Sequence, residues 1–259
     1  MHKKKYKQGE TDTYGLIGFP LTHSFSADFF NDKFQREGIA ARYLNFEIED
    51  IQEIQNILLH HPRLRGINVT IPHKESILQF LDEMTPVAKR IGAVNAIRVL
   101  RKQGRDDSFR LLGHNTDYVG FKESISPLLD PALHRKALVL GTGGASKAVV
   151  NALSDLGIEW KYVSRSPGVD RFVYDDLTPQ VISEYRVIVN ASPVGTYPHV
   201  DRCPDLLYEH LTPYHVLYDL VYNPERTLFL EKGEERGAAI KNGKEMLELQ
   251  ALAAWDFWK

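Results

Sequence analysis

The feature that most constrains the fold is a glycine-rich turn between a short apolar strand and a helix. Residues 136–157 read KALVLGTGGASKAVVNALSDLG, in which an apolar run leads into GTGGAS and then into a helical pattern that stops near Gly157. In this setting backbone N–H groups and the positive end of a helix can face a pyrophosphate. Gly141 permits the tight turn, and Gly143 lets a phosphate approach the backbone. Taken alone, the motif also fits an ordinary glycine turn.

Short apolar runs alternate with helical patterns on both sides of this turn. In the second half, strands are predicted at 137–140, 160–163, 187–192 and 216–222. In the first half, strands are predicted at 14–20, 42–48 and 65–70, with helices over 26–37 and 50–60. The runs at 95–100 and 109–113 flank a polar turn and predict a hairpin, and an amphipathic helix is expected over 244–259. The fold class is therefore α/β, with a mostly parallel first sheet and a doubly wound parallel second sheet.

Length and composition exclude several classes of protein. The 259 residues allow one large domain or two smaller ones, and the net charge of −2 lacks the basic excess of a general nucleic-acid or membrane-surface binder. The single cysteine, Cys203, cannot form an intrachain disulfide, and no Cys/His cluster has zinc spacing, so no metal is expected. No apolar run reaches the roughly 18 residues that span a bilayer. A cytoplasmic protein without nucleic-acid or membrane partners is expected.

The residues that follow the second strand of the glycine-turn half bear on the cofactor. An NAD site usually places Asp or Glu there, about 20 residues after the glycines, to hold the ribose hydroxyls. This chain has Ser164-Arg165-Ser166 instead. Because a carboxylate repels a 2′-phosphate whereas an arginine pairs with it, the sequence favours NADP over NAD. The alternative for Arg165 is a solvated surface arginine.

Polar residues in the first half suggest a second binding region. Ser24 and Ser26 stand at the entrance to a helix, where they can cap it or bind a ligand carboxylate or hydroxyl. In NVTIPHK, a strand ends at Thr70 and Lys74 emerges at the carboxyl edge of a sheet. Asp117 follows where the two halves meet. A lysine and an aspartate facing one cleft can bind a polyol and handle its proton, and a surface salt bridge is the alternative.

Eight blocks, taken together, resemble the shikimate dehydrogenase family. In order along the chain they are HSFS, NVTIPHK, GAVNA, NTD, GTGGAS, NASPVG, DLVYNPERTLFL and GKEMLELQA. The resemblance implies NADP-dependent reduction of 3-dehydroshikimate to shikimate, in the pathway to aromatic amino acids. It also implies an N-terminal α/β substrate-binding domain over 13–115 and 242–259, and a Rossmann NADP-binding domain over 116–241. The implied partner is the small-molecule substrate, and the implied state is a monomer or a homodimer.

The same resemblance assigns roles residue by residue. Lys74 becomes the catalytic residue, paired with Asp117. The implied substrate-binding residues are Ser24, Ser26, Thr70, Asn95, Asp117, Tyr222 and Gln250. The implied cofactor-binding residues are Gly141, Gly143, Gly144, Ala145, Ser164, Arg165 and Gly243. This assignment favours ligand binding over capping for the two serines.

The chain departs from the family pattern mainly on the cofactor side. The family often reads NRT where this chain has Ser164-Arg165-Ser166, and the segment that follows contains Pro167, Gly168 and Pro179, so its helix is expected to be shortened or absent. Three alternatives stay open. They are a quinate/shikimate dehydrogenase that prefers NAD, a noncatalytic dinucleotide-binding protein on the same fold, and a family member that acts on a different hydroxy acid.

Overall fold

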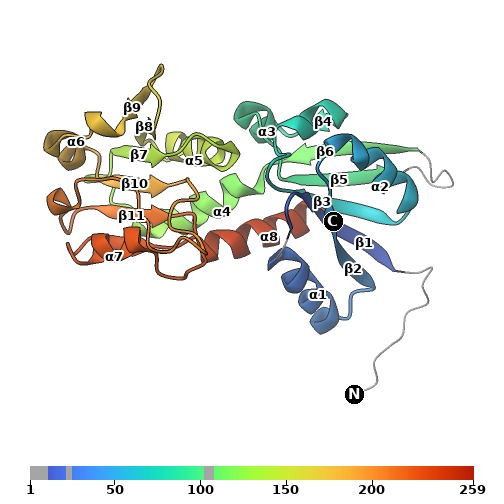
Figure 1. Ribbon diagram of the computed structural model, residues 1–259. Coiled ribbons are helices and arrows are strands. Elements are labelled where there is room, and N and C mark those ends of the chain that lie inside the picture. Colours follow the sequence, from blue (N-terminus) through green and yellow to red (C-terminus); the bar gives the residue numbers. More distant parts are fainter. Residues whose placement is uncertain (1–10, 22–24, 102–107) are drawn as a thin grey trace. The chain divides into compact units, whose positions relative to one another are not determined.

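The chain forms two compact units, each with its own sheet. The computed structural model (Figure 1) describes residues 11–21, 25–101 and 108–259. The first unit comprises the described residues up to Thr116 together with Ala254–Lys259, and the second comprises Asp117–Ala253. The first boundary falls at the start of helix α4 (Thr116–Ile125), and the second lies within helix α8 (Lys244–Trp258). The division into a substrate-binding and an NADP-binding domain at 115/116 and 241/242 is a functional assignment, and it stays a prediction.

The first unit is built on a mixed sheet in the order β2-β1-β3-β5-β6-β4. Its strands are β1 (Asp12–Gly18), β2 (Ala41–Glu47), β3 (Leu64–Val69), β4 (Glu83–Met84), β5 (Ala96–Arg101) and β6 (Phe109–His114). Strand β1 pairs in parallel with β2 and β3, as the β-α-β-α-β order predicts. Strand β5 is antiparallel to both β3 and β6, which confirms the predicted hairpin and makes the sheet mixed.

Helices and aromatic residues cover the sheet of the first unit. The helical elements are α1 (Phe25–Glu37), η1 (Ile51–Glu53), α2 (Ile54–His60), η2 (Ser76–Phe80) and α3 (Pro86–Ile91). The helix predicted over 50–60 is divided into η1 and α2. On α1, the Phe30 ring packs against the Trp258 indole, and the Phe34 ring packs against Tyr14 and the Trp255 indole. Tyr14 also contacts both indoles. The last residues of the chain therefore belong to this core, in agreement with the predicted packing role of the two tryptophans.

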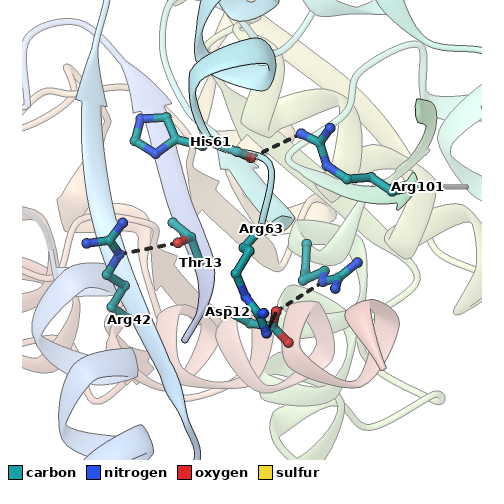
Figure 2. A network of polar contacts seen from close by, with 7 residues as sticks. Asp12, Thr13, Arg42, His61, Arg63 and Arg101 are labelled. Atoms are coloured by element: carbon teal, nitrogen blue, oxygen red, sulfur yellow. Dashed lines mark hydrogen bonds and ion pairs between the residues drawn. The ribbon is translucent and has the colours of Figure 1, made fainter. Parts of the chain in front are cut away.

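Ion pairs and hydrogen bonds to main-chain carbonyls link the residues at the amino-terminal ends of the parallel strands in the first unit (Figure 2). Asp12, at the start of β1, pairs with Arg63 (3.0 Å) and Arg65 (3.2 Å). Arg101, at the end of antiparallel β5, donates to the carbonyl of His61 at 3.0 Å. The arginines that pair with Asp12 are about two-fifths exposed, so these pairs contribute little stability. In parallel α/β sheets ligands bind at the opposite, carboxyl edge, where Thr70 and Lys74 lie.

The second unit is a Rossmann-type domain. Its strands are β7 (Lys136–Leu140), β8 (Glu159–Ser164), β9 (Arg171–Val173), β10 (Val187–Asn190), β11 (Val216–Asp219) and β12 (Ala239–Lys241). They lie in the order β12-β11-β10-β7-β8-β9, and every pairing is parallel. This is the 6-5-4-1-2-3 order of a doubly wound nucleotide-binding sheet, so the predicted fold class is confirmed.

Helices pack on both faces of this parallel sheet (Figure 1). They are α4 and α8, together with α5 (Gly144–Asp155), α6 (Pro179–Glu184) and α7 (Leu228–Glu234). Ala137 and Val139 of β7 join a core with α4, α5 and α8, whereas Leu138 and Leu140 join the core with α6 and α7. This alternation is why β7 reads as a continuous apolar run. Within the described part of the chain, no helix is long and apolar enough to cross a membrane.

Two strands of the second sheet end earlier than the sequence predicts. The predicted strands over 187–192 and 216–222 stop at Asn190 and Asp219. The side chains of these two terminal residues hydrogen-bond to main-chain atoms of the following loops, which leave the ladder at that point. The helix expected to be shortened after Pro167 is the six-residue α6, which begins at Pro179 behind a Thr178 cap.

Candidate active site

The segment that follows β3 holds Lys74 through its main chain. The Thr70 N–H donates to the Ile17 carbonyl at 2.8 Å, and the Val94 N–H donates to the Lys74 carbonyl at 2.8 Å. The buried His73 ring lies 2.8 Å from the Ile48 carbonyl, so this histidine is structural. Lys74 is therefore fixed at the carboxyl edge of β3, while its side chain is only partly buried.

A buried polar network lies beside this segment in the first unit. The Asn95 Oδ1 accepts from the Thr116 N–H at 2.7 Å, and the Asn95 Nδ2 donates to the Thr116 Oγ1 at 3.0 Å. Asn68 donates to the Asn95 carbonyl at 3.1 Å and accepts from the Tyr43 hydroxyl at 2.8 Å. The Tyr43 hydroxyl also hydrogen-bonds to Ser26, and burial raises the pKa of this tyrosine well above its usual value. The network thus connects Ser26 to Thr116, the residue before Asp117.

These contacts change the interpretation of Ser26, and they add Asn68 to the candidate site. Ser26 is the second residue of α1 and its hydroxyl reaches Tyr43, so it lies within the helix rather than at its cap. Ser24 lies outside the described residues. Asn68 was missed, because one polar residue inside the apolar run of β3 looks like a variation in the strand. A polar residue inside a run that reads as a buried strand was the available signal, and the structure places Asn68 at 5% exposed.

In the second unit, helices α4 and α8 approach closely beside Asp117. Gly120 lies one turn after Asp117 on α4, and a Cβ at Gly120 would lie 3.0 Å from the Gln250 N atom. The Gln250 side chain is buried and donates to the Leu247 carbonyl at 2.9 Å. Because Gly120 has no side chain, α4 and α8 can pack closely at the positions that carry the predicted substrate residues Asp117 and Gln250.

The loop after β11 carries Tyr222, whose side chain is 42% exposed. The start of α8 supports this loop, because the Gly243 N–H donates to the Val221 carbonyl at 3.1 Å. A Cβ at Gly243 would collide with the Leu220 carbonyl. Gly243 therefore has a packing reason to be glycine, and its predicted contact with the cofactor stays a prediction.

The glycine turn joins β7 to α5 in the geometry that its sequence predicts. Gly141 has φ +103°, a conformation that favours glycine, and its N–H donates to the Val163 carbonyl at 2.9 Å. Gly143 precedes α5 in an extended conformation and supplies no side chain to the first turn, which begins with Gly144 and Ala145. A Cβ at Gly143 meets none of the described atoms within 4 Å. The start of α5 is thus open to an anion.

Strand β8 ends next to this turn and presents a cation. Leu140 pairs with Val163, so Ser164 and Arg165 follow at the same sheet edge as Gly141. Arg165 is exposed, and the Ser164 Oγ accepts from the Ser166 N–H at 3.4 Å. A helix start that no described side chain covers, at the same sheet edge as an exposed arginine, fits a dinucleotide that carries a 2′-phosphate. In the part of the chain that the structure describes, no three His, Cys, Asp or Glu side chains form a group that could hold a metal ion.

Comparison with known proteins finds shikimate dehydrogenases, and the match extends over nearly the whole chain. A family model for the shikimate dehydrogenase substrate binding domain matches residues 16–97. The chain is 36% identical over 265 residues to shikimate dehydrogenase (NADP(+)) of Carboxydothermus hydrogenoformans, which covers 96% of this chain and 92% of the relative. The first sheet and the second sheet are therefore both covered by one relative.

Solved structures extend the similarity to the fold. The crystal structure of shikimate dehydrogenase from Aquifex aeolicus matches with a TM-score of 0.84 and 32% identity, covering 98% of this chain and 94% of that one. Shikimate 5-dehydrogenase of Thermus thermophilus, solved in complex with NADP(H) and shikimate, matches with a TM-score of 0.81 and 30% identity, covering 96% and 94%.

Proposed function

Because the chain belongs to the shikimate dehydrogenase family, we propose that it catalyses the NADP-linked interconversion of shikimate and 3-dehydroshikimate. The observation that carries this proposal is that Lys74 and Asp117, which the motif resemblance assigns to catalysis, lie in or directly after segments fixed by the hydrogen bonds described above, in a chain 36% identical to such an enzyme. The relative solved with NADP(H) and shikimate supports the choice of both ligands. The cytoplasmic location, and a monomer or homodimer as the active form, belong to the same proposal.

The proposed reaction combines a hydride transfer from the cofactor with a proton transfer that Lys74 carries out. NADPH, when bound, supplies the hydride to the ketone carbon. Lys74, as an ammonium, stabilises the oxygen on which negative charge develops and donates a proton to it. Asp117 orients Lys74 and accepts a hydrogen bond from a neighbouring ring hydroxyl. In the oxidation direction, Lys74 takes the hydroxyl proton back.

The two ligands are assigned to two sets of residues. We assign the substrate carboxylate to Ser24 and Ser26. We assign the ring hydroxyls to the remaining substrate residues, Thr70, Asn95, Asp117, Tyr222 and Gln250. The open start of α5, with Gly141, Gly143, Gly144 and Ala145, holds the pyrophosphate, and Arg165 with Ser164 holds the 2′-phosphate. The geometry of the glycine turn and of Arg165 described above supports the cofactor assignment, and the domain assignment 13–115 with 242–259 against 116–241 belongs to the same proposal.

A substitution at Lys74 tests the catalytic assignment. Lys74→Ala is expected to lower kcat for shikimate oxidation by about 10²–10⁴, the range for general acid–base assistance, with a much smaller change in KM. Lys89→Ala, on the exposed face of α3 in the same unit, is the matched control and should keep wild-type kcat. Near-wild-type turnover in Lys74→Ala would remove Lys74 from the mechanism.

A further inference from the structure

Two adjacent strands of the second unit end in buried polar residues whose side chains meet. Asn190 ends β10 and Asp219 ends β11, and the two residues are partners in the parallel register. Both are fully buried, and Thr227, at the start of α7, is 1% exposed. Such polar groups are costly to bury unless they satisfy one another, so their partners define what they hold.

The Asp219 carboxylate accepts three hydrogen bonds from both sides. Its Oδ1 accepts from the Asn190 Nδ2 and from the Val221 N–H, each at 3.0 Å. Its Oδ2 accepts from the Thr227 Oγ1 at 2.6 Å. Burial raises the pKa of Asp219 to about 6, and these three donors act against that rise. At neutral pH the group is therefore an ionised acceptor, whose hydrogen bonds are stronger than neutral ones.

Asn190 extends this contact into the loop that follows β10. Its Oδ1 accepts from the Ser192 N–H at 3.1 Å and from the Ser192 Oγ at 2.6 Å. Its Nδ2 also donates to the Val194 carbonyl at 3.2 Å. Further along, the Tyr197 N–H donates to the Asn223 carbonyl at 3.2 Å, so the loops 191–197 and 220–227 meet again at these two residues.

Each of the two loops touches a different part of the proposed site. The carbonyl of Ala191, in the first loop, lies 3.2 Å from the position of a Cβ at Gly141, so this loop lies against the glycine turn. The second loop carries Tyr222, and its Val221 carbonyl receives the N–H of Gly243. A shift of one loop relative to the other would therefore move the cofactor turn relative to a substrate side chain.

We propose that Asp219 is a positioning residue that, through Asn190 and Thr227, holds the loops 191–197 and 220–227 together so that the cofactor turn and Tyr222 keep a fixed relation. The proposal rests on the proposed function, because it assumes that Gly141 serves the cofactor and Tyr222 the substrate. Asp219 itself is fully buried and acts through the loops.

A pair of matched threonine substitutions tests the link to Asp219. Thr227 and Thr178 each cap a short helix of the second unit, α7 and α6, by accepting a hydrogen bond from the main chain. Only Thr227 also donates to Asp219. Thr227→Val and Thr178→Val therefore remove the same kind of cap, and Thr227→Ser keeps the hydroxyl as a conservative rescue. For each variant, kcat, KM for shikimate, KM for NADP and Tm are measured.

The expected result is a kinetic defect confined to one variant. Thr227→Val should raise KM for shikimate and lower kcat, with a combined loss in kcat/KM of about 10-fold or more, as for a lost hydrogen bond to a charged group. Thr178→Val should lose only the Tm that an exposed helix cap contributes and keep wild-type constants, and Thr227→Ser should recover most of the loss. Equal kinetic constants in Thr227→Val and Thr178→Val would overturn the proposal.

A second readout separates this proposal from the assigned activity. Amide hydrogen exchange at Val221, Ser192 and Val194 reports the order of both loops without any substrate. Thr227→Val should speed exchange at all three, and Thr178→Val at none of them. If the wild-type enzyme fails to oxidise shikimate, the proposed function fails while this readout still tests the link between the loops. Unchanged exchange in Thr227→Val would contradict the link itself.

Discussion

At the scale of single residues, burial and hydrogen bonding in the second unit favour the neutral form of His215. The neutral His215 ring fits its partners, because its Nδ1 accepts from the Thr212 N–H at 3.0 Å while its Nε2 lies 2.9 Å from the Ile182 carbonyl. The carbonyl can only accept, so we assign the proton to Nε2. Burial lowers the pKa of His215 below 6.5. A second proton would place an N–H of the ring against the N–H of Thr212.

His215 should therefore make the second unit sensitive to acid. As the pH falls through 6.5, the unfolded chain binds a proton at this histidine before the folded chain does. The free energy of unfolding that His215 contributes is therefore fully present above this pH and decreases below it. His215→Asn keeps an acceptor for Thr212, loses the bond to Ile182, and cannot titrate. The variant should be less stable at pH 8, with a smaller drop in Tm between pH 7 and pH 5.

The exposed His199 provides the control for this titration. His199→Asn should keep the wild-type dependence of Tm on pH. If His215→Asn also kept it, the acid sensitivity would come from other groups.

At the scale of elements, the glycine turn between β7 and α5 combines a backbone requirement with a packing one. Gly141 (φ +103°) and Gly157 (φ +74°) share the left-handed region, where a side chain is strained. Only Gly141 also faces another element, since a Cβ there would lie 3.2 Å from the Ala191 carbonyl, whereas a Cβ at Gly157 meets none of the described atoms within 4 Å. Substitution of Gly157 therefore tests backbone strain alone, whereas substitution of Gly141 tests strain together with the packing of the turn against Ala191.

Alanine at these two positions should have different effects on the enzyme. Both Gly141→Ala and Gly157→Ala should lose roughly 1 kcal/mol of folding stability from the backbone alone. Only Gly141→Ala should raise KM for NADP, by about 10-fold or more, as expected when backbone contacts to a charged phosphate are displaced. Steady-state kinetics with NADP as the varied substrate measures the difference. A wild-type KM for NADP in Gly141→Ala would separate this turn from the cofactor.

The helices and strands differ in how well the sequence predicts them. Long, strongly patterned elements such as β7, α5 and α8 were placed within one or two residues. Helices α3 and α7 were missed because six or seven residues make too few turns to show a period. A threonine followed by proline, as in Thr85-Pro86, was a usable start signal for α3.

The candidate site was predictable where its residues form local motifs. The spacing of residues within GTGGAS predicts a turn, and that within NVTIPHK predicts the end of a strand. The contact between Asn190 and Asp219 depends on which strands are neighbours in the sheet, and the two positions are 29 residues apart in the chain. The link between Asn68 and Asn95 depends on the pairing of β3 with β5 in the same way. Contacts of this kind require the sheet order and its register.

At the scale of the whole molecule, the chain leaves the first unit at Thr116 and returns to it at Ala254. The returning segment is part of the core of that unit. Trp258 is 4% exposed, its indole lies 5.1 Å from the Tyr14 ring, and a Cβ at Gly66 would lie 2.5 Å from it. The first unit is therefore completed only by the last residues of the chain.

Loss of this packing should destabilise the first unit selectively. Trp258→Ala is expected to cost about 3–5 kcal/mol, as for other large-to-small substitutions of buried aromatic residues. Hydrogen exchange should become faster in β1, β2 and β3 and stay unchanged in β7 and β10. The half-buried Phe257 on the same helix is the control, and Phe257→Ala should cost less. Equal exchange in both sheets of Trp258→Ala would contradict a selective role.

The assignment as an NADP-linked shikimate dehydrogenase is tested most directly by initial rates of the purified wild-type chain with four pairs of substrates. Shikimate or quinate is combined with NADP or NAD, and formation of the reduced nicotinamide is followed. The highest kcat/KM is expected for shikimate with NADP, because Ser164-Arg165 stands where an NAD site usually carries a carboxylate. A higher kcat/KM for quinate with NAD, or no reduction with any of the four pairs, would contradict it.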